Sequence, residues 1–103
     1  MNKHDLYMDH LPTDTKYLSI KDVCKRLSRG YSSIDNDVIA GLITPPVKIG
    51  GKLKFWPQFE IDTLLAARMA GKDNEEVKEI VKSLNGKRQE LFNSLFEKHA
   101  AAA

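Results

Sequence analysis

The stretch Val47-Lys48-Ile49-Gly50-Gly51-Lys52-Leu53-Lys54-Phe55-Trp56 decides the fold of this 103-residue chain. Apolar and basic residues alternate on either side of two adjacent glycines, a pattern that predicts a β-hairpin. A two-residue turn at the glycines places Val47, Ile49 and Trp56 on one face. A three-residue loop groups Val47 and Ile49 with Leu53 and Phe55 instead. We favour the two-residue turn, because adjacent glycines suit it.

Two short amphipathic helices precede the hairpin. Residues 19–22, with the sequence SIKD, match a capping box, and helical apolar spacing continues to Leu27. Gly30 is expected to end this helix in the left-handed conformation. Residues 32–35, with the sequence SSID, repeat the capping pattern, and Gly41 is placed to stop the second helix. Two short helices joined by a glycine-containing turn predict a helix-turn-helix whose second helix is the recognition helix.

Helical patterns also follow the hairpin. Pro57 suits the first position of a third helix, which is expected to end at Gly71. In the last helical segment, Asn85-Gly86 favours a division into two helices, whereas a seven-residue apolar spacing across it favours one bent helix. The predicted fold is therefore mainly α with a small β-hairpin wing: a winged helix-turn-helix followed by a C-terminal helical extension.

The predicted organisation has four parts. Residues 1–15 show no periodicity and are interpreted as a flexible N-terminal arm. Residues 16–71 form the winged helix-turn-helix. Residues 72–99 either complete the core or mediate dimerisation, because Phe92 with Phe96 leaves an apolar patch that needs cover. The closing alanines, 100–103, are interpreted as a cloning scar and are left out of the fold prediction.

Composition and charge narrow the class of protein. No apolar run approaches the roughly 20 residues of a membrane span, and a single cysteine excludes an intrachain disulfide, so a cytoplasmic location is expected. The net charge is +2, but residues 16–56 carry eight cations against three anions. A basic stretch of this kind favours a polyanionic partner for the first half of the chain.

A longer pattern runs through these elements. It consists of YLSIKDV at 17–23, SSI at 32–34, PVKIGGK at 46–52, Trp56 and FEID at 59–62. This pattern resembles the AlpA-type excisionase and prophage regulatory proteins, a bacterial family with a MerR-like winged helix-turn-helix. The resemblance covers about half of the chain and does not extend to residues 72–99.

The resemblance implies a sequence-specific protein of a mobile element that binds double-stranded DNA in the nucleoid. Such a protein acts as an excisionase, a recombination directionality factor, or regulates transcription of the integrase. Possible partners are the integrase and further copies of the chain, as a homodimer or a cooperative assembly on DNA. The alternatives are an adaptor that binds integrase or itself, and a pure transcriptional repressor without a role in recombination.

The candidate DNA-binding residues lie in the turn, the second helix and the hairpin. They are Arg29, Tyr31, Ser32, Ser33, Asn36, Asp37, Lys48, Lys52 and Lys54. Asn36 suits a bidentate contact with adenine, and Asp37 repels phosphates unless it accepts from a cytosine amine. Relatives usually carry an aromatic and a basic residue where this chain has residues 35–37, with the sequence DND, which shifts weight to Arg29, Tyr31 and the hairpin. The alternatives are a solvated helix face and lysines that guard a sheet edge.

No pattern in the chain indicates catalysis or a bound cofactor. Cys24 shares the apolar stripe of the first helix and is expected to be a small buried hydrophobe. His4, His10 and His99 have no ligand spacing, so a metal site is not expected. Neither a nucleophile–base pair nor a phosphate-binding loop is present. We therefore expect no enzyme activity, no cofactor and no metal.

Overall fold

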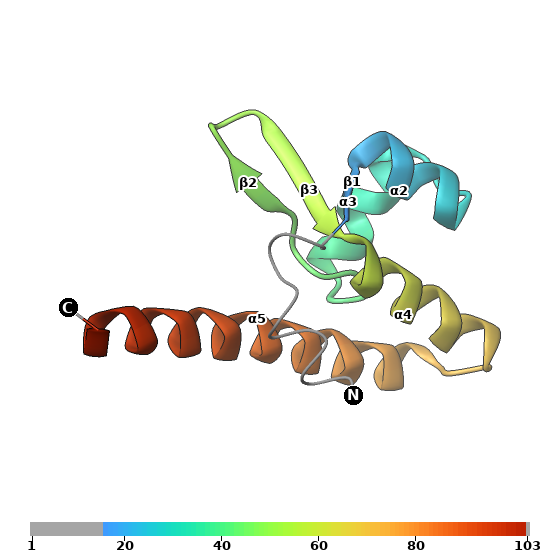
Figure 1. Ribbon diagram of the computed structural model, residues 1–103. Coiled ribbons are helices and arrows are strands. Elements are labelled where there is room, and N and C mark those ends of the chain that lie inside the picture. The colour runs from blue at the N-terminus through green and yellow to red at the C-terminus, as the bar shows by residue number, and fades with distance from the viewer. Residues whose placement is uncertain (1–15, 103) are drawn as a thin grey trace.

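A computed structural model describes residues 16–102, which form a mainly helical fold with a small three-stranded antiparallel sheet (Figure 1). In chain order the elements are β1 (Tyr17–Ser19), α2 (Ile20–Leu27), α3 (Tyr31–Ile39), β2 (Val47–Ile49), β3 (Leu53–Pro57), α4 (Gln58–Met69) and α5 (Asn74–Ala102). The predicted arm at 1–15 and the last alanine of the predicted tail lie outside the described residues. Alanines 100–102 continue α5.

Helix α2 begins as predicted and ends differently. The Ser19 hydroxyl accepts from the Asp22 amide at 3.2 Å, and the Asp22 carboxylate accepts from the Ser19 amide at 3.4 Å, which confirms the capping box. The left-handed residue at the other end is Ser28, with φ of 54°, and not Gly30. Gly30 was the wrong choice because the chain turns earlier, where the Arg29 amide donates to the Cys24 carbonyl at 3.0 Å.

Gly30 instead occupies the N-cap position of α3, in an extended conformation and without a side chain to cap the helix. The helix therefore begins at Tyr31, and the predicted capping box at residues 32–35 is wrong. Ser32 lies inside the first turn, two residues after the cap position. At the other end Gly41 has a φ of 80°, which confirms the predicted stop.

The hairpin between β2 and β3 has the register that we did not favour. Ile49 pairs with Leu53, and Val47 pairs with Phe55, so residues 50–52 form a three-residue loop. Both glycines adopt positive φ, and Lys52 is the third loop residue. The two-residue turn is wrong because it sets apolar residues opposite lysines, whereas the observed register pairs apolar with apolar side chains.

Strand β3 lies between β1 and β2 and gives the sheet two different faces. Trp56 pairs with Leu18, and both side chains are buried in the core. The Trp56 indole N–H donates to the Thr44 carbonyl at 2.7 Å, which ties the segment between α3 and β2 to the sheet. Because side chains alternate along a strand, Lys54 and its partner Lys48 lie on this same face, beyond the core.

Helices α4 and α5 pack against each other and complete the core, whose buried apolar residues are Leu18, Val23, Ile34, Ile43, Trp56, Ile61, Leu64, Ala67, Val77, Val81 and Leu84. Pro57 is the N-cap of α4 and not its first residue, so the helix begins one residue later than predicted. Asn85-Gly86 does not divide the last segment, because α5 runs as one helix through it. Among the described residues no helix has the length and apolar character needed to cross a membrane.

A buried ion pair joins α4 to α5. Glu60, in the first turn of α4, is fully buried, and the Arg88 guanidinium donates to its two carboxylate oxygens at 2.7 and 2.8 Å. The Arg88 side chain is 23% exposed. Glu60 stands three residues after the end of β3, so the pair holds the middle of α5 against the first turn of α4.

Arg88→Met is expected to lower the free energy of unfolding by about 3 kcal/mol, because it leaves the Glu60 carboxylate buried without a counter-charge. The double variant Glu60→Met/Arg88→Met should recover most of this loss. Urea denaturation of both variants tests the expectation. Arg68→Met, which removes only an exposed hydrogen bond to Asn74, is the control. A double variant as unstable as the single one would contradict the assignment.

Candidate nucleic-acid interface

The solvent-facing side of α3 carries polar and apolar side chains but no cation. Ser32 and Asn36 are exposed, as are Asp35 and Ile39, whereas Ser33 is half-buried. The opposite side is anchored by Ile34, which is fully buried. A helix face without lysine or arginine gains little from phosphate contacts, so what it offers a double helix is hydrogen bonding to base edges.

The N-terminal end of α3 is open to solvent. Gly30 supplies no side-chain cap, so no side chain satisfies the first amides of the helix. Tyr31 is 57% exposed beside them, and Ser32 is also exposed. Free amides at a helix start, flanked by hydroxyl groups, are suited to a backbone phosphate.

Two of the predicted residues, Arg29 and Asp37, bind each other. Arg29 Nε donates to Asp37 Oδ2 at 3.1 Å, and Nη2 donates to Oδ1 at 2.9 Å. Their side chains are 46% and 20% exposed. The paired guanidinium compensates the carboxylate, so Asp37 does not present an uncompensated negative charge to phosphates. The same pairing occupies both carboxylate oxygens, which makes Asp37 a poorer acceptor for a base.

The three predicted lysines of the hairpin form one cationic group. Lys48 lies directly opposite Lys54 in the ladder, and Lys52 stands in the loop beside Gly50 and Gly51. All three are exposed, and within residues 16–102 none of them forms an ion pair with an acid. Like charges directly opposite each other destabilise a sheet. This pair is therefore a feature that folding alone does not explain.

Lys48 and Lys54 lie on the face of the sheet that packs against the core at its other end. Lys54 and Trp56 are two residues apart in β3, so the face that carries the lysine pair is the face that packs on the core near its base. Figure 1 shows the hairpin extending away from α2 and α3 with its tip free. The structure thus forms two groups, the lysines on the hairpin and the polar side of α3 with its turn.

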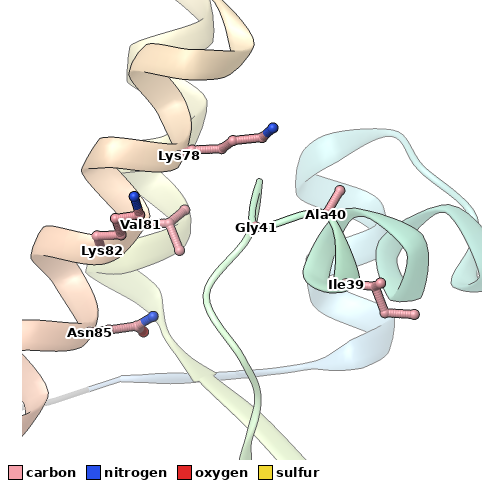
Figure 2. Close-up of a pocket in the computed structure, with 7 residues that line it drawn as sticks. All are labelled: Ile39, Ala40, Gly41, Lys78, Val81, Lys82 and Asn85. Atoms are coloured by element: carbon pink, nitrogen blue, oxygen red, sulfur yellow. The ribbon is translucent and has the colours of Figure 1, made fainter.

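A second surface lined by lysines contains none of the predicted DNA-binding residues. A depression of about 280 Å³ lies between the end of α3 and the first half of α5 (Figure 2). Its two lysines, Lys78 and Lys82, bind Glu75 and Glu79 on their own helix at 3.3 and 3.2 Å. Paired lysines at this end of α3 offer a weaker anion site than the hairpin does.

Sequence reasoning missed both long-range ion pairs of α4. Arg26 of α2 donates to Asp62 at 2.7 Å, and Glu60 binds Arg88. One signal was present, since Arg88 stands seven residues after Val81 and seven before Leu95, where the apolar stripe of α5 calls for another apolar residue. Among the described residues no group of three or more His, Cys, Asp or Glu side chains is arranged to hold a metal ion.

Lys54→Glu should raise the free energy of unfolding by about 0.5 kcal/mol, because it converts an opposed like-charge pair with Lys48 into an attractive pair. Lys52→Glu is the matched control, since its loop position faces no residue across the ladder. Urea denaturation at low salt measures the difference, which added salt should diminish. Equal stabilisation by both substitutions would show that net charge, and not the opposed pair, is responsible.

Comparison with protein-family models, curated proteins and solved structures found no match to this chain. The functional interpretation therefore depends on the chemistry and placement of the side chains described above. The hairpin lysines are the strongest part of that evidence, because all three are exposed and unpaired among the described residues, and Lys48 lies opposite Lys54.

Proposed function

We propose that residues 16–71 are a winged helix-turn-helix that binds double-stranded DNA. In this proposal α2 and α3 are the helix-turn-helix pair and the β2–β3 hairpin is the wing. The observation that carries it is the opposed pair of Lys48 and Lys54, which has no acidic partner among the described residues. Phosphates placed between or beside two such ammonium groups relieve their repulsion. The free energy that this repulsion costs in folding is therefore recovered when a polyanion binds.

The wing would supply affinity. Lys52 stands next to two glycines, and a loop without side chains at two positions lets its backbone come close to a groove or a phosphate strand. The three lysines together allow about three phosphate contacts, each adding roughly 0.9 to the slope of log K against log salt. This assignment agrees with the uneven charge of the chain, whose cations gather in residues 16–56.

Helix α3 would supply sequence discrimination. Asn36 is exposed and presents both a donor and an acceptor, which matches the major-groove edge of adenine. Tyr31 and Ser32 stand at the open helix start, where a phosphate would fix the depth and angle of the helix in the groove. Arg29 would act through Asp37, holding that carboxylate away from the phosphates.

The resemblance to AlpA-type regulators supports a more specific role within this proposal. The protein would bind beside the attachment site of a mobile element, favour excision as a directionality factor, and regulate transcription of the integrase. Binding to attachment-site DNA, followed by an excision assay with and without the protein, tests that role. Binding to this DNA without any effect on excision would favour the alternative function, a transcriptional repressor.

Replacing the wing lysines should weaken DNA binding and its salt dependence together. The variant Lys48→Gln/Lys52→Gln/Lys54→Gln is expected to flatten the slope of log K against log salt by about 3 units, about one for each lost contact. Fluorescence anisotropy with a labelled duplex at several salt concentrations measures it. The control, Lys72→Gln/Lys78→Gln/Lys82→Gln, removes the same net charge from the start of α5 and the residue pair before it, where all three lysines are paired with glutamates. Equal flattening by both variants would rule out the wing as the binding surface.

Asn36→Ala should reduce discrimination at one base pair by about 1–3 kcal/mol and leave the salt slope unchanged, because an amide reads a base edge and neutralises no phosphate. Competition between the preferred duplex and single-position substitutions measures this loss. Asp35→Ala, on the same exposed side of α3, is the comparison variant. A uniform loss of affinity for all duplexes would show that Asn36 does not read a base.

A further inference from the structure

Two apolar patches are exposed within the part of the chain that the structure describes. The helix patch consists of Phe92, Leu95 and Phe96 on α5, which are 57%, 37% and 61% exposed. The rings of Phe92 and Phe96 stack with their centroids 5.6 Å apart. Every side chain of α5 from Phe92 to His99 is exposed, so this patch belongs to a stretch that extends beyond the core. A short helical stretch with exposed aromatic side chains is only marginally stable in water by itself.

The sheet patch lies on the outer face of the sheet, opposite the lysines. It consists of Tyr17, Ile49 and Leu53, which are 46%, 54% and 59% exposed, and the half-buried Val47 and Phe55 lie beside them. The observed register creates this patch, because a three-residue loop places Ile49 opposite Leu53 on the same face as Phe55. No charged side chain belongs to either patch, so each fits a protein surface and not a nucleic acid.

The elements that carry the two patches extend toward the same end of the molecule (Figure 1). Leu91 lies one heptad after Leu84, and Leu95 lies two heptads after Val81, so the stripe continues the core-facing side of α5. The β2–β3 hairpin and the far half of α5 both extend to the left of α4 in Figure 1. The helix packs on α4, and the sheet patch stays exposed in its own chain.

The areas decide how many patches a stable interface needs. With about 200 Å² for each large side chain, the exposed fractions leave about 300 Å² of apolar surface on each patch. A symmetric dimer through the helix patch alone would bury about 600 Å², well below the roughly 1,200 Å² at which stable interfaces begin. Burying both patches on both protomers reaches about 1,200 Å².

We propose that a second copy of this chain covers both patches. The far half of α5 from one protomer lies on the outer sheet face of the other, and a two-fold axis repeats the contact in the opposite direction. Two patches of matched size and uncharged surface satisfy such a self-complementary interface. Lys48 and Lys54 occupy the opposite face of the sheet, so dimerisation leaves this pair free. The inference does not rest on DNA binding, and its test contains no DNA.

Sedimentation velocity of the purified full chain over a range of concentrations tests the proposal. We expect a monomer–dimer equilibrium with a dissociation constant on the order of 10 µM, as befits an interface at the lower size limit. Phe92→Gln/Phe96→Gln and Ile49→Thr/Leu53→Thr should each raise that constant at least about tenfold, although they change different elements. Glutamine suits a helix and threonine a strand, and circular dichroism confirms that each variant folds.

The control variant is Ile39→Gln/Met69→Gln, which removes the two most exposed apolar side chains outside both patches. They are 84% and 81% exposed, and their loss should leave the dimer intact. A chain that stays monomeric at 10-fold above the expected constant overturns the proposal. A dimer that survives the sheet-patch substitutions, or that the control disrupts equally, overturns it as well.

Disulfide trapping distinguishes helix-on-sheet from helix-on-helix pairing. In a Cys24→Ala background, one chain carries Leu53→Cys and another, of different mass, carries Phe96→Cys. Oxidation of the mixture should give cross-linked heterodimers several-fold in excess of either homodimer. Efficient cross-linking of Phe96→Cys chains with one another would mean that the helix patches pair with each other, which contradicts the exchange of α5 onto the partner's sheet.

Discussion

The buried indole of Trp56 is the contact on which the arrangement of this chain depends. Its ring is almost completely excluded from solvent, its strand partner is Leu18, and its N–H donates to the Thr44 carbonyl. One side chain thereby fixes three segments: the first strand, the connection that leaves α3, and the central strand of the sheet. Because strand side chains alternate, burying Trp56 also determines that lysines occupy one distal face and apolar residues the other.

Local signals in the sequence predicted much of the fold. The capping box at Ser19, the stop at Gly41 and the hairpin between two apolar runs need only neighbouring residues, and the structure contains all three. The register of the hairpin was predicted wrongly because two adjacent glycines permit both loops. The choice is made by pairing across the hairpin, where Ile49 lies opposite Leu53 and Val47 opposite Phe55, and not by the glycines. The same applies to Gly30, displaced from its expected role by an earlier turn at Ser28.

The candidate site was predictable as a set of residues but not as a geometry. Residue types and spacing pointed to the lysines and to Asn36, and these side chains are exposed. Nothing in the sequence showed that Arg29 would bind Asp37, or that Lys48 would face Lys54, because both facts depend on packing between elements. The resulting arrangement separates charge from discrimination. Cations gather on the hairpin, while the exposed side of α3 presents amide, hydroxyl, carboxylate and apolar groups.

The ion pair between Glu60 and Arg88 has a consequence for how this chain can evolve or be recombined. Its two members lie on opposite sides of Gly71, the residue at which sequence patterns divide the chain. A fragment cut there keeps a carboxylate inside its core and loses the Arg88 guanidinium that binds it. The first 71 residues are therefore not a portable module. Gene fusions and domain shuffling must carry α5 along, or replace Glu60 in the same step.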